Sequence, residues 1–176
     1  MNGGSPNLTA MARPKQIPDS DVHRAILHLL CTEGDKSVSF SRVARLSGLA
    51  PATLVQRFGG MDAMMTAALC AGWDAAEAAL TNVAHASHNS RGIRQILKSL
   101  PPNTGLLSAS ARDSALRQRA TAWRRAVEAA LAARLTGKTN AAQTAAILFA
   151  FWQGQSAWQN IGGKGPRLKD ALKRLL

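Results

Sequence analysis

The stretch "LSGLAPATLVQRFGG", Leu46 to Gly60, combines helix-breaking residues with apolar residues at helical spacing. Proline is tolerated in the first turn of a helix, because the backbone N–H group that it lacks has no partner there. Glycine adopts the positive φ that a tight turn requires, and it commonly ends a helix. The stretch therefore predicts a turn at Gly48 and a helix of about two turns that begins at Pro51 and ends at Gly59.

Two more helical patterns precede this stretch. The first begins at Asp19, where Asp19 or Ser20 can act as the N-cap, and stops at Gly34. The second begins at Ser39 and ends before Gly48. The positions expected to be buried in the two helices are Val22, Ile26, Leu29, Leu30, Val43, Ala44 and Leu46. Short helices on either side of a glycine turn indicate a helix-turn-helix.

The helix that begins at Pro51 is expected to have an inner and an outer face. Leu54 and Phe58 lie one turn apart and are expected to point inward. The outer stripe consists of Pro51, Ala52, Val55 and Gln56. A glutamine can pair with adenine, and small apolar side chains fit thymine methyl groups. The flanking side chains that suit phosphate contacts are Ser39, Ser41, Arg42, Thr53 and Arg57.

A helical hairpin with a solvated outer face would explain the inward pair equally well. It would not explain an uncharged, largely apolar outer stripe that is bordered by arginines. The formal net charge of +12, from 22 basic and 10 acidic residues, also favours a polyanionic partner, with nucleic acid ahead of a membrane surface. The sequence therefore favours double-stranded DNA as a partner.

Downstream of Gly60 the chain keeps helical spacing and shows no strand-like alternation. The expected helical segments are 61–85, 91–100, 106–135, 140–161 and 167–176. The 106–135 segment is expected to be a short helix that runs directly into a long one. We therefore predict an all-α protein with a flexible basic arm over residues 1–16, a helix-turn-helix domain over 17–62 and a second helical domain over 63–176.

Signs of other chemistry are weak. Cys31 and Cys70 are far apart and indicate neither a disulfide framework nor a zinc site. His85 and His88 have no third ligand nearby, so no metal is expected. We find no catalytic triad and no phosphate-binding glycine loop, and we expect neither an enzyme nor a cofactor. A cytoplasmic location without a membrane partner is expected, because no stretch shows a secretion signal or reaches the roughly 20 apolar residues of a membrane span.

The segment "SFSRVARLSGLAPATLVQRFGGMDAMMTAAL", Ser39 to Leu69, resembles the DNA-binding signature of TetR-type transcriptional regulators. The matching positions are Glu33, Gly34, Val43, Ala44, Gly48, Thr53, Leu54 and Phe58. The resemblance implies a repressor that binds a palindromic operator as a homodimer through a three-helix head. It also implies that a small-molecule effector binds the C-terminal domain and releases the DNA.

The sequence departs from the family pattern at three positions. Ala50 stands where a serine usually caps the recognition helix, Val55 replaces a common tyrosine, and Met61 replaces a common lysine. The tyrosine and the lysine ordinarily contact phosphates. A second hypothesis therefore stays open, in which the chain is an all-α small-molecule sensor or interaction protein that keeps the dimer but binds DNA weakly or not at all.

Small residues recur at every fourth position of the 140–161 segment, as Ala142, Ala146, Ala150 and Gly154. Such a ridge lets a partner helix approach closely, although the central core helix of a monomer would be equally apolar. The resemblance favours a dimer interface beside which residues 167–176 pack. Its expected members are Ala146, Ala150, Phe151, Gly154 and Trp158.

An effector pocket needs apolar walls and a few polar groups. The candidates are Trp73, Leu97, Leu116, Arg119, Trp123 and Trp152, of which the aromatic residues can equally belong to the core. Arg119 shares the apolar stripe of its helix, three residues after Leu116 and four before Trp123. It can anchor an anionic effector, extend its charged end to solvent, or pair with a carboxylate.

Overall fold

The computed structural model describes residues 17–175, except for residues 84, 86–87, 102, 136, 138, 159–161 and 163–164. The predicted arm over residues 1–16 lies outside this range. The described residues form helices and no strand, which confirms the all-α prediction. The helices are α1 (Asp19–Glu33), η1 (Asp35–Ser37), α2 (Phe40–Ser47), α3 (Pro51–Phe58), α4 (Met61–Asn82), α5 (Ser90–Ser99), α6 (Thr104–Ser110), α7 (Ser114–Ala132), α8 (Ala141–Trp158) and α9 (Leu168–Leu175).

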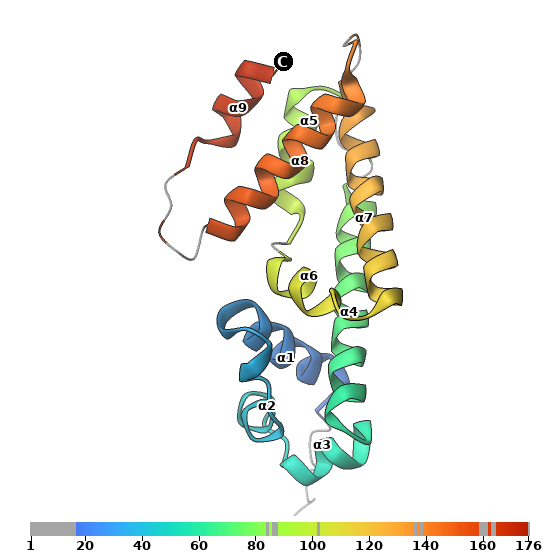
Figure 1. Cartoon of the computed structure of the whole chain (residues 1–176), viewed down its shortest axis with the longest axis vertical. Coiled ribbons are helices and arrows are strands. Elements are labelled where there is room, and N and C mark those ends of the chain that lie inside the picture. Colours follow the sequence, from blue (N-terminus) through green and yellow to red (C-terminus); the bar gives the residue numbers. More distant parts are fainter. Residues whose placement is uncertain are drawn as a thin grey trace, which may run out of the picture.

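Helices α1, α2 and α3 form a small head at one end of the molecule (Figure 1). The Ser39 side chain caps α2 by accepting a hydrogen bond from the Arg42 backbone N–H, at 3.3 Å. Gly48 then takes a left-handed conformation with φ 79°, and Pro51 occupies the first turn of α3. Gly59, with φ 77°, ends that helix. The predicted turn, helix start and helix end are all confirmed.

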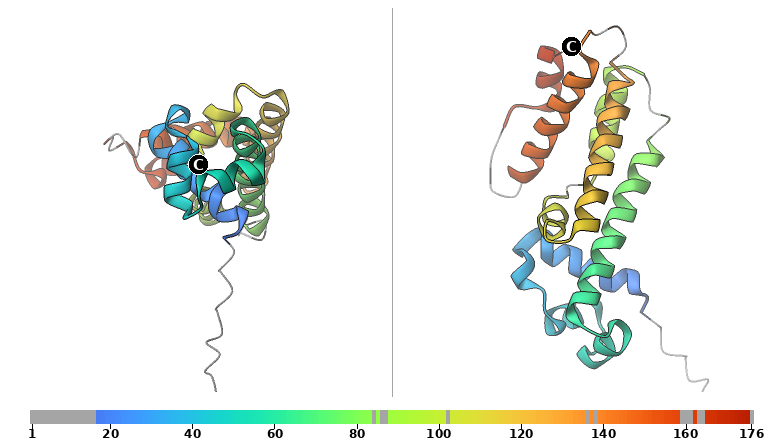
Figure 2. Two further views of the ribbon diagram at one scale, coloured as in Figure 1. Left: turned by 90° about the horizontal axis from the view of Figure 1, so that it is seen from below. Right: turned by 45° about the vertical axis from the view of Figure 1, so that its right-hand side comes forward.

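The long helix α4 belongs both to the head and to the C-terminal part of the chain (Figures 1 and 2). Its first half packs on α1 and α3, and its second half lies along α7. At Gly72 the three helices α1, α4 and α6 come together so closely that a Cβ atom would lie 3.0 Å from Leu106 Cδ1 and 3.1 Å from Leu27 Cδ2. The predicted domain boundary between residues 62 and 63 falls inside the first turn of α4.

The C-terminal part is a layered bundle in which α8 packs across α7 and α6, and α9 packs on α8 and α5. Its centre is a row of aromatic rings from three helices. Ring centroids lie 5.8 Å apart for Trp73 and Trp123, 5.9 Å for Trp123 and Phe149, and 5.9 Å for Phe149 and Trp152. These spacings are those of favourable edge-to-face and tilted pairs.

Two details of the head were wrongly predicted. Neither Asp19 nor Ser20 caps α1: the N-cap position is held by Pro18, and Asp19 is already inside the helix, where its carboxylate contacts Arg57. Leu46 is 47% exposed instead of buried, because Val43 and Ala44 occupy the inner side of this short helix.

Two element boundaries were also wrong. Helix α4 ends at Asn82 and does not reach His85. The short and the long helix expected within 106–135 are both present as α6 and α7, but one does not run directly into the other, because the Asp113 carboxylate accepts a hydrogen bond from the Leu116 backbone N–H at 2.9 Å and starts α7 separately. The last residues of the predicted 140–161 helix, 159–161, lie outside the described residues.

Candidate nucleic-acid interface

Helix α3 has the two faces expected from its sequence. Leu54 is completely buried, and the half-buried Phe58 packs against His23 with ring centroids 5.9 Å apart. The exposed positions are Pro51, Ala52, Val55 and Gln56. Val55 is 45% exposed, which is unusual for a β-branched apolar side chain. The head therefore presents an uncharged, largely apolar stripe on an exposed helix.

The residues predicted to flank this stripe divide into free and engaged side chains. Ser41 is exposed on α2, and Thr53 is half-buried on α3. The Ser39 hydroxyl oxygen already accepts a bond as the cap of α2, so its first role is structural. The first turn of α4 is not capped by any side chain, since Gly60 precedes it.

Both flanking arginines bond to α1, and one of them also bonds to Ile17, two residues before that helix. Arg42 forms a two-pronged pair with Glu33, with nitrogen–oxygen distances of 2.7 and 2.5 Å. This hydrogen-bonded guanidinium lowers the pKa of the Glu33 carboxyl and raises the pKa of Arg42 itself. Arg57 Nη1 donates to the Ile17 carbonyl oxygen at 2.7 Å and to Asp19 at 3.3 Å. The two arginines therefore tie α2 and α3 to the two ends of α1.

These ion pairs were not found from the sequence. Glu33 lies nine residues before Arg42, and Asp19 lies 38 residues before Arg57. The sequence did hold one sign of these pairs: the predicted first helix has an acidic residue at each end, Asp19 and Glu33.

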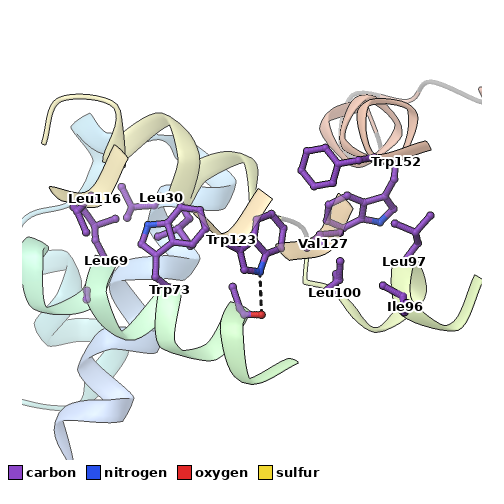
Figure 3. Close-up of a cluster of buried hydrophobic side chains, with 14 of the residues drawn as sticks. Leu30, Leu69, Trp73, Ile96, Leu97, Leu100, Leu116, Trp123, Val127 and Trp152 are labelled. Atoms are coloured by element: carbon purple, nitrogen blue, oxygen red, sulfur yellow. Dashed lines mark hydrogen bonds between the residues drawn. The ribbon is translucent and has the colours of Figure 1, made fainter. Parts of the chain in front are cut away.

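The predicted pocket residues lie along the core instead of around one point. Trp73, Trp123 and Trp152 follow one another from α4 through α7 to α8, whereas Leu116 and Leu97 lie at opposite ends of the row (Figure 3). All five of these side chains are buried. The indole N–H of Trp73 bonds to Ser110 Oγ at 3.0 Å, and that of Trp123 bonds to the Ala76 carbonyl oxygen at 3.1 Å (Figure 3). The arrangement is that of a packed core, and the predicted pocket role of these residues stays a prediction.

Arg119 pairs with carboxylates of α4. Its Nε and Nη2 atoms bond to the Glu77 carboxylate at 2.7 and 2.9 Å, its Nη2 also contacts Asp74, and its Nη1 donates to the Cys70 carbonyl oxygen at 3.2 Å. These bonds raise the pKa of Arg119, and its pair lowers the pKa of Glu77. Of the three alternatives that the sequence left open, the geometry favours the carboxylate pair, because the guanidinium is already engaged on each of its nitrogens.

The arrangement of the helices can be compared with known proteins. It matches the crystal structure of a protein from Rhodococcus sp. that is assigned to the TetR family of transcriptional regulators. The match covers 89% of this chain and 93% of the other, with a TM-score of 0.55 and 17% sequence identity. The chain has a TetR-type fold. No family model matches the sequence, and no curated protein matches it either.

In this TetR-type fold the predicted interface residues of α8 lie on its outer side. Ala150, Gly154 and Trp158 are exposed, the last at 57%, whereas Ala146 and Phe151 are half-buried. Helix α8 turns other residues inward, namely Ala145, Leu148, Phe149, Trp152 and Ser156. The small-residue ridge is therefore not the part of α8 that fills the core of the chain, and Ile147, 46% exposed, extends the uncovered apolar surface.

The described ranges contain neither a candidate membrane span nor a candidate metal site. No helix there is both long and apolar enough to cross a bilayer. No three histidine, cysteine, aspartate or glutamate side chains gather there as a metal site.

Proposed function

We propose that this chain is a ligand-responsive transcriptional repressor that binds a palindromic operator as a homodimer. The observation that carries the proposal is the exposed stripe of α3 in the helix-turn-helix of a TetR-type fold. A helix fits the major groove, where Gln56 can pair with an adenine edge, and where Ala52 and Val55 can cover thymine methyl groups. The stripe is neither charged nor buried within the chain, so contact with base edges explains its chemistry better than solvation does.

Phosphate contacts complete the proposed interface. Ser41 and Thr53 flank the stripe, and the uncapped backbone N–H groups at the start of α4 suit an anion. Arg42 and Arg57 would exchange their carboxylate partners for phosphates. The Glu33 and Asp19 carboxylates are 45% and 59% exposed, so water can hydrate them when the arginines turn to phosphates.

The decisive experiment measures binding of the chain to the DNA upstream of its own gene by fluorescence anisotropy across a salt series. We expect specific binding that weakens as salt rises, because phosphate contacts release counterions. Gln56→Ala should weaken this binding by about 1–3 kcal/mol, the worth of a good bidentate base contact. Gln118→Ala is the matched control, because it removes an exposed glutamine from α7, which is not part of the helix-turn-helix.

A specific observation also supports the second hypothesis, a sensor that keeps the fold without operator binding. Arg42 and Arg57 are both paired within the chain, and Val55 and Ala50 offer no phosphate contact. In that case the same titration shows no difference between upstream DNA and a scrambled duplex of equal length, and Gln56→Ala changes nothing.

The dimer part of the proposal is supported by the exposed ridge of α8. Ala150 and Gly154 would let a second copy of the helix approach closely, and Trp158 would cover part of the contact. A dimer would place two α3 helices for two operator half-sites about one turn of DNA apart, or a multiple of it.

Helix α6 packs on α1 of the head, so an effector would cause release of the DNA by moving α6. A ligand that binds one arrangement of α6 more tightly than another would shift the population of head positions. The separation of the two α3 helices in the dimer would then no longer match the operator.

A further inference from the structure

Two carboxamide side chains meet inside the C-terminal part, where the second half of α8 approaches α6 (Figure 1). Gln153 Nε2 donates a hydrogen bond to Asn103 Oδ1 at 3.0 Å. Asn103 directly precedes α6 and is 2% exposed, and Gln153 is half-buried on α8. The two residues are 50 positions apart in the sequence, so the fold brings them together.

This single bond leaves the pair unsatisfied. Asn103 Nδ2 and Gln153 Oε1 are buried and have no hydrogen-bond partner in the described structure. Turning both amides over exchanges the two roles, but one NH₂ group and one carbonyl oxygen remain unpaired in either case. Buried polar atoms are almost always paired in folded proteins, because an unpaired one destabilises the fold. The hydrogen-bonded pair thus keeps one buried donor and one buried acceptor without partners.

The Asn103 side chain does not cap α6, although its position would allow this. An asparagine just before a helix commonly accepts hydrogen bonds from N–H groups of the first turn. Asn89 does so before α5, where its Oδ1 accepts from the Arg91 and Gly92 N–H groups at 2.9 and 3.1 Å. Asn103 holds the same position before α6 and makes no such bond. Its carboxamide is directed towards α8 instead.

We propose that Asn103 and Gln153 are the polar recognition element of an effector site, and that the effector is a neutral molecule with adjacent hydrogen-bond donor and acceptor groups, such as an amide or a lactam. The proposal rests on the proposed function, because it assigns the effector of that regulator. The unpaired NH₂ group requires an acceptor, and the unpaired carbonyl requires a donor. An amide supplies both in one planar group, whereas a carboxylate supplies acceptors only.

Two other features of the C-terminal part agree with a neutral effector. Arg119, the cation that the sequence suggested as an anchor for an anion, is held by Asp74 and Glu77. Trp152 precedes Gln153 on α8 and packs on Phe149 and Trp123, so the helix that carries one of the carboxamides also carries aromatic side chains, which suit the apolar remainder of such a ligand.

The test compares three probes that share one ring, namely benzamide, benzoate and toluene, by saturation-transfer NMR at millimolar concentration without DNA. We expect benzamide to bind the full chain and benzoate to bind at least about tenfold more weakly. In the double variant Asn103→Leu/Gln153→Leu, benzamide binding should be lost while toluene binding persists. The thermal midpoint should stay equal or rise, because no unpaired polar atom remains.

A single variant tests the proposal even if the double variant does not fold. Gln153→Met keeps the side-chain length and removes the carbonyl acceptor, so it should weaken benzamide relative to toluene. Gln118→Met, on the exposed side of α7, should leave all three probes unchanged.

Three results would overturn the proposal. These are the absence of benzamide binding to the wild type, binding that both variants leave intact, and tighter binding of benzoate than of benzamide. A lower thermal midpoint in the double variant together with unchanged benzamide binding would assign the pair a purely structural role. Because these measurements contain no DNA, they stay separate from a failure of operator binding.

Discussion

At the scale of single residues, the interior depends on a few polar groups that are paired across the core. The two central indoles each donate one hydrogen bond, Trp73 to Ser110 and Trp123 to the backbone of Ala76. Ser110 is 1% exposed, so its hydroxyl group has no access to water. These bonds fix the orientation of large rings that would otherwise pack in several ways.

Ser110→Ala should lower the free energy of unfolding by about 1–3 kcal/mol, because it leaves the Trp73 N–H group buried without a partner. Chemical denaturation followed by tryptophan fluorescence measures this change. Ser108→Ala is the control, since Ser108 is exposed on the same short helix and should change stability by less than about 0.5 kcal/mol. Equal stabilities of the two variants would show that the bond contributes nothing.

The Arg119 pair predicts a pH dependence. Because Arg119 holds the pKa of Glu77 below its ordinary value of 4.5, the pair stabilises the fold above that value. This contribution is lost as the pH falls through the lowered pKa. Glu77→Gln should therefore destabilise the protein at neutral pH by roughly 0.5–1 kcal/mol, a modest value because both side chains are partly exposed.

The difference between wild type and Glu77→Gln should shrink steadily below pH 4.5. Thermal unfolding at several pH values measures it. Glu128→Gln, which breaks an exposed pair with Arg124 within α7, is the comparison. A stability difference that stays constant from neutral to acidic pH would contradict the assignment of the effect to the Glu77 charge.

At the scale of elements, α6 is the piece that connects the C-terminal part to the head. A Cβ atom at Gly105 would lie 2.8 Å from the Leu30 carbonyl oxygen and 2.9 Å from Cys31 Cα, both backbone atoms of α1. A glycine is therefore required for the helices to meet at this distance. Because the two backbones touch here, a shift of α6 must also shift α1.

Gly105→Ala should destabilise the protein by about 1–3 kcal/mol, the usual cost of an added group in a tightly packed site. This occurs although alanine is intrinsically favoured over glycine in a helix by about 1 kcal/mol. Urea denaturation measures the change, with Ser108→Ala as the control from the same helix. A stabilised Gly105→Ala variant would show that α6 and α1 separate easily.

The helices themselves were largely predictable from the sequence, because their signals are local. Pro51, Gly48 and Gly59 determine the limits of α3 through backbone preferences that act within a few residues. The start of α7 was not predicted, although Asp113 is an ordinary N-cap residue, because the apolar spacing on either side suggested that the short helix runs directly into the long one.

Interactions between distant segments were not predictable. Arg119 was correctly placed on an apolar stripe, but its partners lie 42 and 45 residues earlier, on a helix whose register against α7 the sequence does not reveal. The Asn103–Gln153 pair was missed for the same reason. Neither residue belongs to a sequence motif that would suggest a partner. Only the packing of α8 against α6 brings the two side chains together.

At the scale of the whole molecule, α8 has an inner face in the core and an outer face that the described residues leave uncovered. Trp158 is 57% exposed and Ile147 46%, and glycine and alanine lie between them. At Gly154 a Cβ atom would meet no other atom within 4 Å. The chain alone thus has room for a large side chain at this position.

Gly154→Arg should fold normally and should abolish the proposed dimer, because a charged side chain would occupy the ridge on which the second copy packs. Light scattering at micromolar concentration should give twice the chain mass for the wild type and the single chain mass for Gly154→Arg. Gln118→Arg adds the same charge to the exposed surface of α7 and should remain dimeric. A wild type that is monomeric at this concentration would contradict the dimer.

The continuity of α4 determines how this protein can be recombined with others. The helix begins as part of the head and ends against α7, without a loop at which the chain can be divided. A chimaera cut at residue 62 would separate the buried side chains of Met64, Ala68 and Leu69 from the head helices on which α4 packs. A change of the proposed effector specificity should therefore be made by substitutions within the C-terminal helices, with α4 and the α1–α6 contact left as they are.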